Sequence, residues 1–174
     1  MIIKGSIVNL RPWKEADLPT ITALRNDVVL QAKLLAIARG SKESEVRDWL
    51  EKRSSGTDKL FFVIAEPSSD DAIGYLQFLD IDPVNLHADM GICLSPASQS
   101  KGAGTEALKL VLAELADKTK LRKVNLRVRV DNPAAIRCYR GVGFLQSGLL
   151  VEHVFIEGTW QDIVLMEYFL LRKN

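Results

Sequence analysis

The stretch at residues 95–117, SPASQSKGAGTEALKLVLAELAD, decides how the rest of this sequence is interpreted. Three small residues, Gly102, Ala103 and Gly104, are followed immediately by the pattern of an amphipathic helix. The predicted apolar side of this helix carries Gly104, Leu108, Val111, Leu112 and Leu115, and the opposite side carries Glu106, Lys109, Ala113 and Asp117. The first N–H groups of a helix lack internal partners and carry partial positive charge, so an anion such as phosphate is a natural ligand. A tight glycine turn into a buried helix is an equally good interpretation until the flanking sequence is considered.

Two common phosphate-binding motifs do not match this stretch. The phosphate loop of nucleoside triphosphatases ends in Gly-Lys-Ser or Gly-Lys-Thr, and neither is present. The dinucleotide motif needs a third glycine and an acidic residue about twenty positions further on. The pattern is instead Gln99-x-x-Gly102-x-Gly104, so the neighbouring segments must identify the ligand.

Length and composition indicate one globular domain over residues 1–174. The formal net charge is +1, with Lys and Arg spread along the chain, so neither nucleic acid nor an anionic membrane surface is implied as a partner. No apolar run approaches the length of a membrane span, and a cytoplasmic location is expected. The two cysteines, Cys93 and Cys138, have neither metal-ligand nor disulfide-framework spacing, so no metal is expected and neither thiol is favoured as a nucleophile.

The first part of the chain predicts one strand and two helices. Residues 5–10 are expected to form the strand. Asp17 is expected to cap a helix that reaches about Arg25. Residues 28–40 have no clear period and fit either more helix or a mobile loop. Ser41 is predicted to cap the second helix, which runs to about residue 52.

Three strands are predicted next, and the last of them has an informative alternation. Residues 60–65 and 72–81 read as a hairpin around a polar turn, and residues 86–94 follow as a strand. One side of that strand carries Leu86, Ala88, Met90, Ile92 and Leu94, and the other carries His87, Asp89, Gly91 and Cys93. The second set is not expected to form a core face. Gly91 predicts either a bulge or the close approach of another backbone or a ligand.

The last part of the chain completes a mixed sheet flanked by helices. Residues 123–130 are predicted as a strand, and a right-handed crossover makes it parallel to the strand at residues 86–94. Asn132 is expected to cap a short helix that ends at Gly141 or Gly143. Residues 144–171 are expected to form two long strands around a turn near Glu157 and Gly158.

Two motifs together give the sequence a family resemblance. They are Gln99-x-x-Gly102-x-Gly104 at the helix start and Asn132-x-x-Ala135-Ile136-x-x-Tyr139-x-x-x-Gly143-Phe144 after the next strand. In this order they resemble the GNAT N-acetyltransferases, over the whole length of the chain. Asp89-Met90-Gly91-Ile92 and the segment from Glu152-His153 to Asp162 resemble the group that contains ribosomal-protein alanine and spermidine acetyltransferases. The resemblance implies a single-domain α/β (α+β) fold with a mixed, mostly antiparallel sheet that splays at a parallel strand pair and is flanked by about four helices.

The resemblance also implies acetyl-CoA as the donor, with direct transfer of acetyl to a primary amine in a ternary complex. Backbone N–H groups at the helix start are expected to hold the pyrophosphate, and the pantetheine arm is expected between the two splayed strands. The expected donor-binding residues are Ile92, Cys93, Leu94, Gln99, Lys101, Gly102, Ala103, Gly104, Thr105, Asn132 and Ala135. Solvated side chains at Gln99 and Lys101, and a purely capping role for Asn132, are the alternative interpretations.

Two residues are expected to carry the chemistry. Tyr139 matches the tyrosine that protonates the leaving thiolate in the family, although packing on an amphipathic helix also explains it. A primary amine is mostly protonated at neutral pH and must lose a proton before it attacks. Asp89 is the leading candidate for the base, directly or through a water, and His87 is the alternative.

The acceptor is left open by the sequence. Residues proposed to recognise it are Arg25, Asn26, His87, Glu152 and His153, together with residues 28–40. A protein N-terminus, a polyamine and a nucleotide-linked amino sugar all remain candidates, and so does an acyl-CoA-binding sensor without activity. A homodimer is a further open alternative. Arg127 and Arg129 are interpreted as surface partners of carboxylates, with contact to a CoA phosphate as the alternative.

Overall fold

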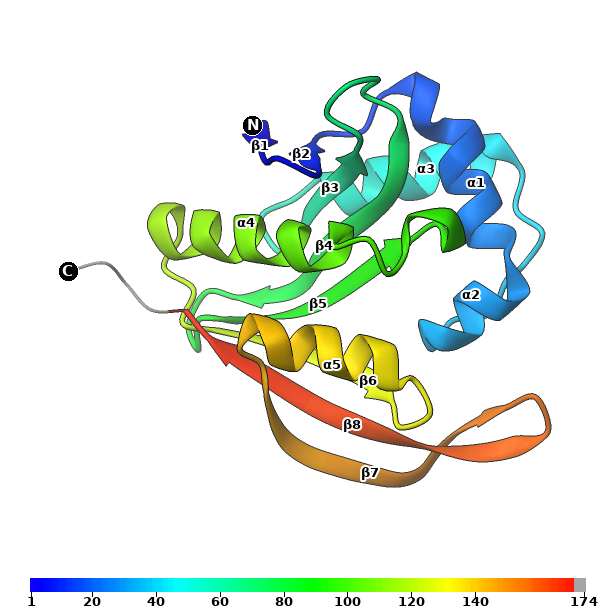
Figure 1. Cartoon of the computed structure of the whole chain (residues 1–174), viewed down its shortest axis with the longest axis vertical. Coiled ribbons are helices and arrows are strands. Elements are labelled where there is room, and N and C mark those ends of the chain that lie inside the picture. The colour runs from blue at the N-terminus through cyan, green and yellow to red at the C-terminus, as the bar shows by residue number, and fades with distance from the viewer. Residues whose placement is uncertain (171–174) are drawn as a thin grey trace.

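The computed structural model describes residues 1–170, which form one eight-stranded sheet with the strand order β1-β2-β3-β4-β5-β6-β8-β7 (Figure 1). The strands are β1 (Ile3–Lys4), β2 (Asn9–Arg11), β3 (Leu60–Ala65), β4 (Ala72–Asp82), β5 (His87–Leu94), β6 (Lys123–Arg129), β7 (Leu145–Ile156) and β8 (Thr159–Phe169). Neighbouring strands are antiparallel except β5 and β6, which are parallel. The predicted fold class and the predicted parallel pair are therefore confirmed.

Helices cover both faces of the sheet. The helices are α1 (Leu18–Asn26), α2 (Val28–Lys33), α3 (Glu43–Ser54), α4 (Ala103–Lys118) and α5 (Pro133–Val142). Helices α4 and α5 lie side by side on one face, and α1 and α3 pack on the other (Figure 1). The described part of the chain thus contains five α-helices rather than about four, because six residues of the ambiguous segment 28–40 form α2. No helix among these residues is long and apolar enough to cross a membrane.

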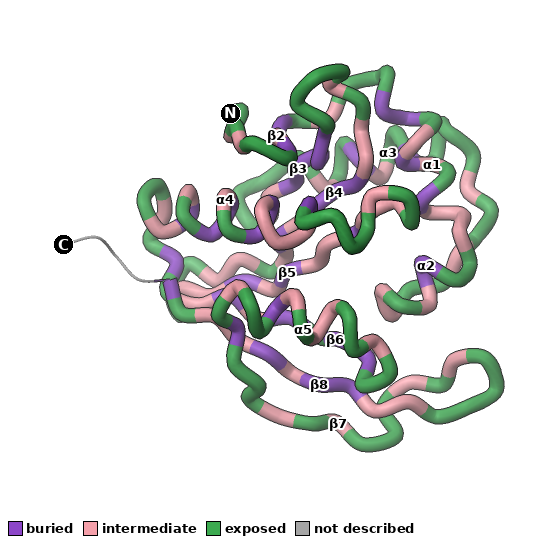
Figure 2. The backbone as a smooth tube through the Cα atoms, viewed as in Figure 1, coloured by how far each residue is buried: buried purple, intermediate pink, exposed green. Residues whose placement is uncertain are grey.

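Two hydrophobic clusters hold the layers together, and Figure 2 shows the buried residues on the central strands. The larger cluster lies under α4 and α5, and the smaller one lies under α1 and α3. Strand β5 contributes Ala88 and Met90 to the first and Cys93 to the second. The expectation that the Cys93 side of this strand is not a core face is therefore wrong at Cys93, because α1 and α3 cover that end of the strand.

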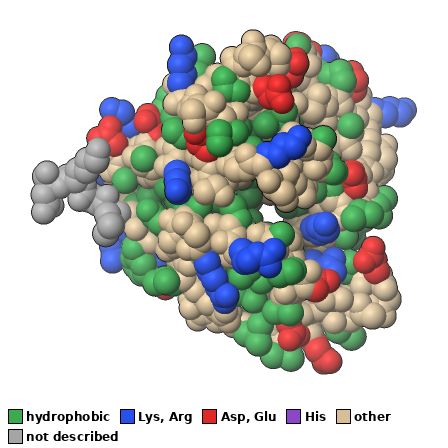
Figure 3. Space-filling model, in the orientation of Figure 1, with side chains coloured by type: hydrophobic (Ala, Val, Ile, Leu, Met, Phe, Trp, Pro, Cys, Tyr) green, Lys and Arg blue, Asp and Glu red, His purple; other side chains and the backbone are tan. Residues whose placement is uncertain are grey.

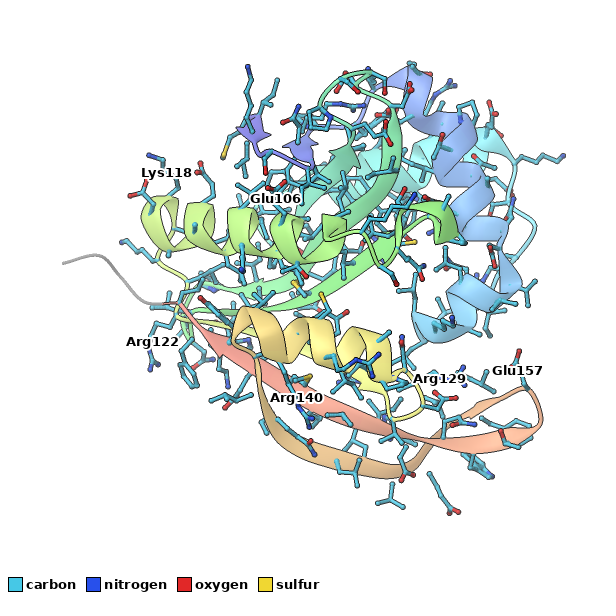
Figure 4. All side chains as sticks on the ribbon, in the orientation of Figure 1. Glu106, Lys118, Arg122, Arg129, Arg140 and Glu157 are labelled. Atoms are coloured by element: carbon cyan, nitrogen blue, oxygen red, sulfur yellow. The ribbon has the colours of Figure 1, made fainter. Side chains whose placement is uncertain are left out.

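The predicted first strand at residues 5–10 is replaced by two short strands and a turn. The cause is Glu106 on α4, whose carboxylate accepts hydrogen bonds from the backbone N–H groups of Ser6, Ile7 and Val8 at 3.1, 2.6 and 2.8 Å and from the Ser6 hydroxyl at 2.6 Å. Figure 4 shows Glu106 on the side of α4 that faces β1 and β2. Glu106 is therefore a tertiary anchor and not part of a solvated helix face, and no local pattern in residues 5–10 reveals it.

Two predicted helix caps are also corrected. Asp17 stands at the N-cap position of α1 as expected, but its buried carboxylate forms a two-point ion pair with Arg11 at 2.8 and 2.9 Å and makes no capping hydrogen bond to this helix. The cap of α3 is Lys42, whose N–H donates to the Glu45 carboxylate at 2.7 Å. The predicted cap, Ser41, instead donates its N–H to Asn26.

Gly91 does not form a bulge. The β4–β5 register is continuous from Gly74↔Leu94 to Leu79↔Asp89, and the irregularity lies between Leu79 and Asp82. The remaining interpretation of Gly91, a close approach by another group, is the one that the site geometry tests. At the end of the chain, β7 and β8 turn at Glu157 and Gly158 as expected, and residue 171 of the predicted last strand lies outside the described residues.

Candidate active site

Strands β5 and β6 pair over three residues and then separate. Their parallel ladder joins His87 to Lys123, Ala88 to Val124 and Asp89 to Asn125, and it has no pair beyond Asp89↔Asn125. We call this opening the fork. A cleft of about 910 Å³ occupies it and reaches both sides of the sheet, and Figure 3 shows the surface hollowed between β5 and α5. The edge of β5 beyond Asp89 therefore faces the cleft in place of a neighbouring strand.

The glycine-rich loop borders this cleft. Gly102 has φ +84°, a left-handed conformation that favours glycine, and α4 begins at the next residue, Ala103. A Cβ atom added to Gly104 would lie 3.2 Å from Leu94 Cδ1, so the glycine lets the helix start pack closely on the end of β5. The unpaired N–H groups of the first turn of α4 are therefore adjacent to the open edge of β5.

The predicted donor-binding residues fall into two groups. Those that line the cleft are Ile92, Cys93, Leu94, Gln99, Gly102, Gly104, Thr105, Asn132 and Ala135. Lys101 and Ala103 instead line a separate hollow of about 140 Å³ on the other side of the loop. The Gln99 amide donates to the Leu94 carbonyl at 3.0 Å, so this side chain fixes the end of β5. The Asn132 side chain accepts from Ala135 N–H at 3.3 Å and caps α5 as expected.

Tyr139 lies on the α5 face that borders the cleft. Its side chain is 9% exposed, and its ring packs 5.8 Å from the ring of Phe144, which accounts for its packing role. The hydroxyl has no hydrogen-bond partner among residues 1–170. Burial raises the pKa of Tyr139, and the nearby Cys138 raises it further. The hydroxyl therefore stays protonated at neutral pH and can donate a proton to a group in the cleft.

Asp89 reaches the cleft from the sheet face that α1 and α3 cover. It shares this face with Cys93, and the Asn125 amide lies 3.4 Å from its Oδ1 atom. His87 does not line the cleft: its Nε2 lies 3.9 Å from Asp82, and its Nδ1 is buried without a hydrogen-bond partner among the described residues. Of the two base candidates, Asp89 alone borders the cleft.

The two cysteines occupy different environments. Cys93 is 1% exposed beside Tyr75, and burial raises the pKa of its thiol to about 12. It remains a neutral thiol, in agreement with the expectation that it does not act as a nucleophile. Cys138 is half-buried in the cleft wall, where its Sγ lies 3.4 Å from the Thr105 hydroxyl.

Of the segment 28–40 that was expected to recognise the acceptor, Leu30, Lys33, Leu34 and Leu35 line the cleft. The other candidates, Arg25, Asn26, His87, Glu152 and His153, do not. Arg25 stacks on Trp49, with its guanidinium carbon 3.9 Å from the ring centre, and burial lowers its pKa. The Asn26 amide bonds the backbone of Ser41 in both directions, at 2.9 and 2.7 Å, which joins the end of α1 to the chain that enters α3.

The other acceptor candidates lie on the β7 side of the molecule. Glu152 and His153 are exposed at an irregularity of β7, where Glu152 N–H donates to Asp162.

Arg129 is paired with the Asp131 carboxylate as expected, but it is buried rather than at the surface, and it also donates to Ala32 O at 3.4 Å (Figure 4).

Sequence reasoning missed several groups that line the cleft. They are Gln77, Asp80, Asn125 and Glu167, which come from the neighbouring strands. Asn125 lies beside Asp89 because of strand register, which the sequence does not show. Among the described residues, no group of three or more His, Cys, Asp or Glu side chains is arranged to hold a metal ion.

These features fit a donor with a phosphate-bearing end and an extended, amide-containing arm. The start of α4 offers unpaired N–H groups to an anion, and the open edge of β5 offers backbone groups to amides. A CoA thioester, as used by acyltransferases, has a pyrophosphate at one end and amides along its arm and is a donor of this kind.

Residues 8–145 match the model of the acetyltransferase (GNAT) domain, and the chain therefore belongs to the GNAT acetyltransferase family. It is similar to spermidine N(1)-acetyltransferase of Vibrio cholerae, with 32% identity over 97% of this chain and 96% of the relative. It is also similar to ribosomal-protein-serine acetyltransferase of Escherichia coli, with 30% identity over 62% of this chain and 59% of the relative. The crystal structure of the Vibrio cholerae spermidine N-acetyltransferase in complex with CoA and spermine superposes with a TM-score of 0.86 and 26% identity over 95% of this chain and 97% of that chain. The chain is thus a GNAT-type N-acetyltransferase.

Proposed function

We propose that this enzyme transfers acetyl from acetyl-CoA to a primary amine by direct attack, with both substrates bound at once. The observation that carries this proposal is that Asp89 and Tyr139 border one cleft at the fork, although they come from β5 and from α5. The cleft reaches both faces of the sheet, so donor and acceptor have separate approaches to one point.

The donor side is formed by the fork and by the start of α4. The N–H groups from Lys101 to Thr105 hold the pyrophosphate, and the β5 edge from Ile92 to Leu94 pairs with the pantetheine amides. Asn132 and Ala135 form the wall at the start of α5. Main-chain groups near Ile92 polarise the thioester carbonyl.

Asp89 and Tyr139 move the protons of the reaction. Asp89, directly or through a water, accepts the proton that the ammonium group must lose before attack and passes it to solvent. The amine nitrogen then forms a bond to the acetyl carbon, the bond between that carbon and sulfur breaks, and the nitrogen gives a second proton to Asp89. Tyr139 donates its hydroxyl proton to the leaving sulfur and is reprotonated from solvent. Because burial raises the pKa of Tyr139, its hydroxyl is still protonated at neutral pH.

A polyamine is the acceptor that the observations support best. Asp80 and Asp89 line the cleft, and neither forms an ion pair among residues 1–170. A third carboxylate in the cleft, Glu167, is paired with Lys123 at 3.2 Å. Lys33 and Arg127 also line the cleft without an ion pair among these residues, so the two carboxylates favour a ligand with more than one positive charge only in their own part of the cleft. Relatives in Vibrio cholerae and Escherichia coli are spermidine acetyltransferases, which agrees with this choice.

The test is CoA thiol release from acetyl-CoA with a panel that contains spermidine, a peptide with a free N-terminus and a nucleotide-linked amino sugar. We expect release with spermidine at the highest kcat/KM, and intersecting initial-rate patterns when both substrates are varied. Parallel patterns would contradict direct attack, and a preference for either other acceptor would contradict the polyamine assignment. Acetyl-CoA binding without release for any amine would instead identify a sensor.

A further inference from the structure

Gln77 on β4 has an unmet hydrogen-bond requirement inside the cleft. Its side chain lines the cleft, and its Oε1 atom is buried without a hydrogen-bond partner among the described residues. A buried carbonyl oxygen without a donor is unfavourable, and such groups in native proteins usually serve a bound ligand or water. The observation therefore points to an N–H or O–H donor that enters the cleft at Gln77.

The surroundings of Gln77 leave room for that donor. Gln77 lies directly across from Gly91 in the β4–β5 ladder. Leu79, two residues further along β4, is paired with Asp89. The alternation of a strand puts Gln77, Asp89 and Gly91 on the same face of the sheet. A Cβ atom added to Gly91 would lie 3.4 Å from Gln77 Nε2, which is an ordinary van der Waals distance. Gln77, Asp89 and Gly91 all line the cleft, so the space beside the amide is open to a ligand. The close approach of a ligand at Gly91 stays a prediction.

We propose that Gln77 binds the acceptor amine and selects for a primary amine, an inference that rests on the proposed function. Its Oε1 accepts one N–H of the amine while Asp89 accepts another. A neutral primary amine has two N–H bonds and one lone pair, so two acceptors on the enzyme leave the lone pair as the group that faces the thioester. After attack, one proton is lost to Asp89, and the other stays on the product amide, where Gln77 still accepts it.

A secondary amine separates this role from simple packing. An N-methyl amine has one N–H fewer, so it cannot satisfy Gln77 and Asp89 together when it is neutral. The enzyme should therefore prefer spermidine to spermidine that is methylated once at each terminal nitrogen. The preference should depend on the carbonyl oxygen of Gln77, whereas a purely structural role would affect both amines equally.

The experiment measures kcat/KM for both amines with the wild-type enzyme and with Gln77→Met, Gln77→Glu and Gln77→Asn. We expect Gln77→Met to lower the preference for the primary amine by about tenfold, as for the loss of one hydrogen bond. Gln77→Glu keeps an acceptor oxygen at the same reach and should retain the preference. Gln77→Asn withdraws the amide and should lose it, which keeps the inference testable if the Met variant does not fold.

Two controls separate this inference from the function on which it rests. Gln161→Met changes a glutamine whose amide donates to Thr159 near the β7–β8 turn, away from the cleft, and it should leave the preference unchanged. Acetyl-CoA affinity, measured by calorimetry, should be the same for the wild type and the Gln77 variants. An unchanged preference in both Gln77→Met and Gln77→Asn overturns the role of Gln77 alone. Absence of thiol release by the wild-type enzyme with spermidine overturns the proposed function.

Discussion

The side-chain amide of Asn125 lies 3.4 Å from the carboxylate of Asp89, and these two residues form the last pair of the β5–β6 ladder before the strands separate. The carboxylate therefore lies at the base of the fork, where β5 and β6 stop pairing and the cleft begins. A group fixed at this base can reach a ligand that enters from the side of α1 and α3 while the donor lies along the open edge of β5.

If Asp89 accepts the amine proton, its importance should depend on how basic the amine is. Asp89→Asn should lower kcat/KM for spermidine by about 10²-fold or more, and should flatten the limb of the pH profile that reports the base. With a fluorinated amine that is already neutral at pH 7, the loss should be much smaller, because no proton must be removed before attack. Equal losses with both amines would assign Asp89 to binding alone, and an unaltered pH limb would favour His87 or water as the base.

Tyr139→Phe should lower turnover by about 10²-fold, because it removes the proton donor and keeps the ring that packs on Phe144. Acetyl-CoA affinity and thermal stability should change little, which calorimetry and a melting curve can check. A donor thioester with a more acidic leaving thiol needs less help from an acid, so the variant should lose less activity with it. Turnover that is unchanged at every pH would show that Tyr139 is not the acid.

Gly104→Val should weaken the binding of acetyl-CoA. A Cβ atom at this position would already lie 3.2 Å from Leu94, so the larger valine side chain would collide with Leu94 and crowd the first turn of α4. We expect KM for acetyl-CoA to rise at least about tenfold, the effect of one lost hydrogen bond to a charged group. Acetyl-N-acetylcysteamine is a matched donor that lacks the pyrophosphate, so its turnover should be affected much less. The same loss with both donors would mean that the variant damages the fork and not an anion site.

Glu106→Gln should destabilise the fold without changing the chemistry. Burial alone raises the pKa of Glu106, but the hydrogen bonds from Ser6, Val8 and Ile7 outweigh it and leave the pKa below its ordinary value. The amide places an NH₂ group against backbone N–H donors, and we expect a loss of about 2 kcal/mol in the free energy of unfolding. This corresponds to a decrease in Tm of about 4–8 °C.

The pH dependence of this effect follows from the sign of the shift. A depressed pKa means that the carboxylate stabilises the fold above the ordinary Glu value, and that the contribution is lost as the pH falls through the lowered pKa. The difference in Tm between wild type and Glu106→Gln should therefore be full at pH 7 and shrink in acid. Glu114→Gln on the same helix is the control and should leave Tm nearly unchanged. A Glu106 variant that melts like this control would show that the turn at residues 5–8 is held by other contacts.

The sequence by itself determined the features that depend on neighbouring residues. Apolar spacing predicted α4 and its buried side, Gly102 has the positive φ expected of a glycine in the loop, and Asn132 caps α5. These interactions span a few positions along one chain segment, so they leave a pattern in the sequence. The order of the elements and the parallel pair followed from the same patterns together with the handedness of crossovers.

Only the tertiary structure decided which side chains meet in the cleft. Asn125 lies beside Asp89, and Gln77 across from Gly91, because of strand register, which is set by packing over the whole sheet. The same is true of Glu106, which shapes a turn about a hundred positions away in the chain, and of Asp17, whose carboxylate pairs with Arg11 and makes no hydrogen bond to the first turn of α1. A carboxylate looks the same in the sequence whether it caps a helix, faces solvent or binds a distant backbone, so its role is fixed by the groups that the fold brings to it.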